Sequence, residues 1–196
     1  MNIKIYYKET PSIINNEFKI LYINEKKICN KIINNGIKAN DIAVLFRANF
    51  QSRILEEAFI ANGIPYQMLG TKFFERKEIK DIVAYLRLAF NPDSIGDLKR
   101  VINTPVRGIG KTTLMKVVEG KEDELPPKAK IAVATFRTLV EKIKQFALEN
   151  NLSKTITYIA EQTGILREIQ AEKNEDAVDR EENIKELVTL ASRYDT

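Results

Sequence analysis

The hydrophobic pattern of this chain changes near Pro92, and this change most constrains the fold. Before Pro92, apolar runs of strand length alternate with amphipathic segments of helix length. Strands are expected over residues 3–7, 42–46 and 64–69, and helices over residues 15–34, 52–62 and 75–90. Such alternation is typical of an α/β fold with a mainly parallel sheet. The run 42–46 is apolar throughout, which favours a strand buried on both faces.

The part after Pro92 is expected to be all helical. Its apolar residues recur with helical spacing, and no convincing strand is found. Helices are expected over residues 97–103, 111–119, 128–149, 153–163 and 175–192, with a polar loop over 120–127. We place the boundary between residues 91 and 97. The predicted fold class is therefore α/β followed by all-α, with domains 1–96 and 97–196.

The composition excludes several classes of protein. The chain has no histidine and a single cysteine, Cys29, so an internal disulfide is impossible and most zinc sites and Ser-His-Asp triads are ruled out. No acidic cluster is typical of a hard-metal loop, so no metal site is expected. Neither a membrane-spanning run nor a signal pattern is found, so we expect a cytoplasmic protein without a membrane partner.

The charge is unevenly distributed along the chain. Residues 99–144 contain eleven Lys/Arg and five Asp/Glu, whereas residues 145–196 contain six and eleven. The basic middle favours a polyanion partner, and ordinary solvated helix faces would explain it equally well.

A glycine-rich stretch begins at Gly108 and superficially matches a phosphate-binding P-loop. The stretch reads Gly-Ile-Gly-Lys-Thr, but Pro105 occupies the position where the P-loop pattern requires its first glycine. The preceding residues 98–104 are polar and helix-like, whereas a P-loop follows a buried strand. A nucleotide-binding P-loop is therefore disfavoured.

The same stretch suits a different role, as a short turn that enters a helix. Its two glycines allow close backbone approach, and the N–H groups at the helix start face an anion. Arg107 and Lys111 add positive charge on either side. This pattern is typical of a contact to DNA backbone phosphates. A plain turn between two helices is the alternative interpretation.

Three stretches together resemble the UvrD/PcrA/Rep group of superfamily 1 helicases. Residues 42–53 resemble motif IV of that group, residues 73–87 resemble motif IVa, and residues 103–110 resemble its duplex-contacting Gly-Ile-Gly element. The resemblance implies a motor of two RecA-like domains with ATP between them. Residues 1–96 would be the first segment of the second RecA-like domain (2A), and residues 97–196 an incomplete helical accessory subdomain (2B).

The resemblance also implies site residues. Arg47 would be the catalytic residue that reaches the ATP γ-phosphate, and Phe46 would stack on adenine, although Phe46 could equally be a core residue. The residues implied to contact single-stranded DNA are Lys72, Phe73 and Arg76. For Phe73 the alternative is a core position. The residues implied to contact duplex DNA are Arg107, Gly108, Ile109, Gly110, Lys111 and Thr112.

The function expected from the resemblance is part of an ATP-dependent 3′–5′ DNA helicase motor for DNA repair or replication. ATP and Mg²⁺ would serve the full-length parent, and the chain alone would bind neither, because it lacks the P-loop and the Mg²⁺-binding acids. We expect the chain alone to be inactive. Its expected partners are DNA, at the junction of single strand and duplex, and the remainder of the helicase chain. The alternatives are a non-enzymatic DNA-binding or regulatory module and a small nucleotide-binding enzyme that uses Lys111.

Overall fold

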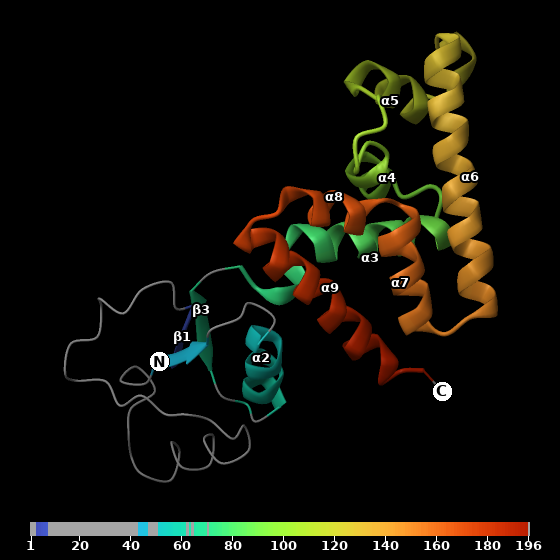
Figure 1. Cartoon of the computed structure of the whole chain (residues 1–196). Helices are drawn as coiled ribbons and strands as arrows, with labels where there is room; N and C mark the ends of the chain where they lie inside the picture. Colours follow the sequence, from blue (N-terminus) through green and yellow to red (C-terminus); the bar gives the residue numbers. More distant parts are fainter. Residues whose placement is uncertain are drawn as a thin grey trace. The chain divides into compact units, whose positions relative to one another are not determined.

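The computed structural model describes residues 3–7, 43–46, 51–61, 63, 65–69 and 71–195. The chain divides into two compact units, residues 1–76 and residues 77–196 (Figure 1). We describe each unit by itself.

The first unit contains a small parallel sheet. Its strands are β1 (Ile3–Tyr7), β2 (Ala43–Phe46) and β3 (Tyr66–Leu69), in the order β2-β1-β3. Ile5 is the register partner of Val44 on one side and of Met68 on the other. Helix α2 (Gln51–Ala61) lies between β2 and β3 in the sequence, as a parallel connection requires. The helix expected over residues 15–34 lies outside the described residues.

The second unit is helical, which confirms the expectation for the C-terminal part. Its helices are α3 (Lys77–Phe90), α4 (Ile95–Val101), α5 (Lys111–Val118), α6 (Pro127–Glu149), α7 (Leu152–Gln162), α8 (Ile165–Glu172) and α9 (Glu175–Ser192). Several details differ from the sequence prediction, and α4 lies two residues before the helix expected over 97–103. Helix α8 was not expected, and the 120–127 loop contains a short 3₁₀ helix, η4 (Glu122–Glu124).

Local sequence explains where several of these helices begin. The side chains of Asn151 and Asn174 accept hydrogen bonds from the backbone N–H groups three residues later, and so cap α7 and α9. Pro127 occupies the first turn of α6, where its missing N–H costs nothing. Gly164, with φ +90°, makes the sharp connection from α7 to α8 that a side chain would oppose.

Helix α3 is central to the second unit. Ile79, Ile82, Ala84, Tyr85 and Leu88 are all buried, and the helix contacts α4, α6, α7 and α9 (Figure 1). This packing explains why the boundary between the compact units falls at residues 76–77 rather than between residues 91 and 97, since α3 belongs by its contacts to the helical unit. The assignment of residues 1–96 and 97–196 to helicase subdomains stays a prediction.

Neither a membrane segment nor a metal cluster is found in the described ranges. No helix there combines the length and hydropathy needed to cross a bilayer. Among the same residues, no group of three or more His, Cys, Asp or Glu side chains could hold a metal ion.

Candidate nucleic-acid interface

The turn between α4 and α5 is organised by Asn103. Its side-chain Oδ1 accepts hydrogen bonds from the backbone N–H of Arg107 at 2.8 Å and from that of Ile109 at 3.1 Å. Ile109 is buried and anchors the turn, while Gly108 adopts φ +74°, a backbone conformation that disfavours other residues. One amide side chain and one apolar anchor therefore fix the shape of the Gly-Ile-Gly element.

The side chain of Arg107 points into the protein. Its Nη1 donates to the carbonyl of Pro105 at 2.9 Å, and its Nη2 donates to the carbonyl of Thr163 at 2.9 Å. The guanidinium carbon also lies 5.8 Å from the ring centre of Tyr85 and 5.9 Å from that of Phe136, which are cation–π distances. These contacts favour a role for Arg107 in positioning the turn.

Tyr85 of α3 holds the other side of the same turn. Its hydroxyl lies 2.6 Å from the carbonyl oxygen of Thr104 and 3.0 Å from that of Val101, and donates to them. Burial raises the pKa of the Tyr85 phenol further above its usual value. The turn is thus attached to α3 by one side chain and to the end of α7 by another.

The start of α5 is open to a ligand. Gly110 is the N-cap residue in extended backbone and provides no side-chain cap. Lys111 and Thr112, in the first helical turn, are exposed. In the part of the chain that the structure describes, no hydrogen bond is found for the N–H groups of Lys111 and Thr112. Uncapped N–H groups beside a lysine can bind an anion such as a phosphate.

The residues expected to contact single-stranded DNA separate into buried and exposed ones. Phe73, in the short 3₁₀ helix η3 (Phe73–Glu75), is 1% exposed, and Arg76 is 7% exposed. Arg76 donates from Nη2 to the Ser52 hydroxyl at 2.9 Å and lies 5.6 Å over the Phe73 ring. Phe73 and Arg76 therefore belong to the core of the first unit, whereas Lys72 and Phe74 are exposed.

Of the two residues expected to contact ATP, the structure describes only the backbone of Phe46. Phe46 is the last residue of β2, so the strand ends where the sequence predicted, but its side chain is outside the description. Arg47 lies outside the described residues. The carboxyl end of a parallel strand is where α/β sheets bind ligands, and Phe46 occupies that position.

Two carboxylates on α3, Glu78 and Asp81, are buried. Asp81 is 4% exposed and pairs with Arg100, whose Nε lies 2.8 Å from its Oδ1. Burial raises the pKa of Asp81, and Arg100 opposes that shift. Glu78 is also 4% exposed and accepts a hydrogen bond from Asn183 Nδ2 at 2.7 Å. The spacing of Glu78 and Asp81 along the sequence does not indicate that they are buried, because their partners come from α4 and α9.

The geometry defines a helical unit with an ordered turn that leads into an uncapped helix start, and comparison with known proteins identifies its family. Residues 3–196 match the UvrD-like helicase C-terminal domain, and the chain belongs to that family. The chain is 36% identical to ATP-dependent DNA helicase UvrD1 of Mycobacterium tuberculosis, aligned over 82% of this chain and 23% of the relative.

Two further relatives show the same pattern. The chain is 37% identical to DNA helicase II of Haemophilus influenzae, with 83% of this chain and 25% of the relative covered. It is 36% identical to ATP-dependent DNA helicase PcrA of Bacillus subtilis, with 81% and 24% covered. The chain therefore spans about a quarter of the length of the curated relatives that it matches.

Proposed function

We propose that this chain is part of an ATP-dependent 3′–5′ DNA helicase motor and contributes DNA contacts and an ATP-sensing arginine. Membership of the UvrD-like family supports the proposal, since relatives at 36–37% identity are named as DNA helicases. The observation that carries it is the turn from Asn103 to Gly110, which presents the open start of α5 beside Lys111.

The proposed duplex contact uses the backbone more than side chains. The N–H groups at the start of α5 and the exposed Lys111 and Thr112 would bind one backbone phosphate, because the partial positive charge of a helix start favours an anion. Gly108 and Gly110 allow the DNA strand to approach closely. Arg107 serves this contact indirectly by fixing the turn from within.

The proposed single-strand contact uses residues adjacent to the buried pair. Lys72 and Phe74 are exposed on either side of Phe73 and can offer a cation and a ring to a phosphate and a base. The buried side chains of Phe73 and Arg76 would support these two exposed residues, because the Arg76 guanidinium packs over the Phe73 ring.

The proposed contribution to the ATP site is Arg47, with Phe46 beside it. The position of Phe46 at the carboxyl end of a parallel strand supports this assignment. An arginine there would stabilise negative charge on the γ-phosphate, while Mg²⁺, a true P-loop and the water-positioning group would come from the remainder of the helicase chain. The chain alone would therefore bind no ATP productively.

The test is fluorescence anisotropy with a labelled duplex that carries a single-stranded tail, titrated at several salt concentrations. Lys111→Ala should weaken binding and make the log–log salt slope shallower by about 0.9, the value for one phosphate contact. It should leave the melting temperature unchanged, because Lys111 is exposed. Equal affinity and equal slope for wild type and Lys111→Ala would rule out the proposed contact at the start of α5.

A further inference from the structure

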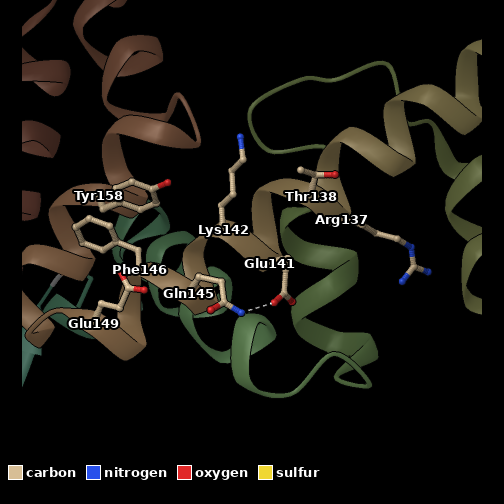
Figure 2. Close-up of a pocket in the computed structure, with 8 residues that line it drawn as sticks. All are labelled: Arg137, Thr138, Glu141, Lys142, Gln145, Phe146, Glu149 and Tyr158. Atoms are coloured by element: carbon tan, nitrogen blue, oxygen red, sulfur yellow. Dashed lines mark hydrogen bonds between the residues drawn. The ribbon is translucent and has the colours of Figure 1, made fainter.

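A groove between α6 and α7 continues from the Gly-Ile-Gly turn. A cavity of about 650 Å³ lies along one flank of α6, and its polar lining includes Arg107, Thr138, Lys142, Tyr158 and Gln162. A second cavity of about 530 Å³ extends it toward the end of α6 and shares Thr138, Lys142 and Tyr158 (Figure 2). We call the two together the α6–α7 groove.

The charge of the groove is positive at the end next to the turn. The lining of the first cavity includes Arg107 and Lys142 and no carboxylate. The guanidinium of Arg107 donates its hydrogen bonds to the backbone carbonyls of Pro105 and Thr163. The second cavity adds Glu141 and Glu149 as well as Arg137, so positive charge predominates only near Lys142 and the turn.

Lys142 is the cation that is available in this groove. Figure 2 shows its side chain extended away from Glu141, whose carboxylate instead accepts a hydrogen bond from Gln145 at 2.8 Å. Lys142 is exposed, and no ion pair with it is found among the residues that the structure describes. A lysine with three donors at the edge of a groove is suited to bind a phosphate.

Tyr158 adds a fixed hydroxyl beside Lys142. Its ring stacks on Phe146 with centroids 4.0 Å apart and an interplanar angle of 9°, so the ring cannot rotate freely (Figure 2). Within the described ranges, the Tyr158 hydroxyl has no hydrogen-bond partner. The hydroxyls of Thr135 and Thr138 differ, because each donates to the carbonyl four residues earlier on α6.

The length of the groove fits a short run of DNA backbone. From Ile131 to Lys142, eleven residues of helix cover about 16 Å. This part of the groove is therefore long enough for only a few phosphates of one backbone. The groove also begins at the turn proposed to bind duplex phosphate, because Arg107 belongs to both.

We propose that the α6–α7 groove binds the phosphate backbone of the duplex beyond the Gly-Ile-Gly turn, with Lys142 as a phosphate ligand and Tyr158 as a hydrogen-bond donor beside it. This inference rests on the proposed duplex contact at the start of α5 and extends it along α6. The contact is independent of sequence, since it involves no base edge.

The test compares Lys142→Gln with a matched control on the same helix. Lys144→Gln removes the same charge two residues further along α6. Lys144 lies about 200° around the helix axis from Lys142. It lines neither cavity. With the labelled tailed duplex and the whole chain, Lys142→Gln should weaken binding about 3- to 10-fold and make the salt slope shallower by about 0.9. Lys144→Gln should bind within about 2-fold of wild type, and both variants should melt at the wild-type temperature.

Several outcomes would overturn the inference. If Lys111→Ala weakens duplex binding and Lys142→Gln does not, the groove is no DNA site while the contact at the start of α5 stands. If Lys142→Gln weakens binding of an acidic peptide, tested with polyglutamate, but not of the duplex, the occupant is a protein. If neither lysine substitution weakens duplex binding, both proposals fail.

Tyr158→Phe should weaken duplex binding less than Lys142→Gln does, because it removes one neutral donor and leaves the stack on Phe146.

Discussion

Arg107 donates a hydrogen bond from Nη2 to the backbone carbonyl of Thr163 at 2.9 Å, although 56 residues separate the two in the sequence. Thr163 follows the last residue of α7, so this bond attaches the α4–α5 turn to the junction of α7 and α8. The same guanidinium also serves the carbonyl of Pro105. A residue expected from the resemblance to contact DNA thus helps to hold the turn in place.

Replacing Arg107 should destabilise the second unit. Arg107→Ala removes charged hydrogen bonds to the carbonyls of Pro105 and Thr163 and should lower the free energy of unfolding by about 2–4 kcal/mol. Urea denaturation measures this. Arg167→Ala, at an exposed position on α8, is the control and should change it by about 0.5 kcal/mol or less. Equal stability of the two variants would contradict the positioning role.

Asn103 offers a variant that separates folding from DNA binding. Asn103→Ala removes the acceptor for the N–H groups of Arg107 and Ile109 and should cost about 1–2 kcal/mol of stability. Asn103→Asp keeps the acceptor oxygen and adds a negative charge beside the proposed phosphate. We expect Asn103→Asp to melt near the wild-type temperature and to bind the tailed duplex more weakly. Tight duplex binding by Asn103→Asp would argue that no phosphate approaches this turn.

The adjacent phenylalanines should respond differently to truncation. Phe73→Ala empties a buried position and should cost about 3–5 kcal/mol of stability. Phe74→Ala should leave stability nearly unchanged and reduce affinity for single-stranded DNA by about 1–3 kcal/mol, the value for loss of one stacking ring. Thermal unfolding and anisotropy with an unpaired oligonucleotide measure the two effects. Unchanged single-strand affinity in Phe74→Ala would remove this ring from the DNA contact.

The ion pair of Asp97 with Arg87 predicts a pH dependence of stability. Arg87 donates from Nη2 to Asp97 Oδ1 at 2.6 Å, and this hydrogen bond lowers the pKa of Asp97 below its usual 3.8. Because the folded-state pKa is the lower one, the stabilisation is present above pH 3.8 and is lost as the pH falls through the lowered pKa. Arg87 is 60% exposed, so solvent screening limits the contribution to about 1 kcal/mol.

The comparison of wild type with Asp97→Asn tests this dependence. Urea unfolding should show the wild type more stable at neutral pH, and the two chains should converge as the pH falls through the lowered pKa of Asp97. A constant difference across this range would assign the effect of the substitution to lost packing rather than to ionisation.

The purified chain should not hydrolyse ATP. Its Gly-Ile-Gly-Lys-Thr stretch is not a true P-loop, because Pro105 stands where the P-loop glycine is required. A phosphate-release assay with Mg²⁺, ATP and DNA should give the blank rate. Turnover above the blank that disappears in Lys111→Ala would instead favour the small nucleotide-binding enzyme.

Local sequence predicted the helices of the second unit well, because their apolar periodicity and their end signals agree. The helix predicted over 175–192 has the bounds of α9, Glu175–Ser192, and the helix predicted over 128–149 differs from α6 by one residue. Helix α8 was missed because it is short and begins directly after Gly164, one residue beyond the helix expected over 153–163. Eight residues give too few turns for periodicity to be recognised.

The site could be predicted less completely, because the orientation of a side chain depends on residues far away in the sequence. Arg107 was recognised as part of the functional motif, but its inward direction depends on Tyr85, Phe136 and Thr163. Glu78 and Asp81 are buried only because Asn183 and Arg100 supply partners from other helices. A charged residue in a helical pattern gives no local sign of such a partner.

The attachment of the turn to Tyr85 has a consequence for its motion. The Tyr85 hydroxyl holds the carbonyls of Thr104 and Val101, and Tyr85 itself is fully buried on α3. The backbone amides of Arg107 and Ile109, which bond to Asn103, lie in the segment held by this attachment, so we expect them to exchange slowly with solvent deuterium. Slow exchange would make the α4–α5 turn a rigid part of the unit rather than a mobile surface loop.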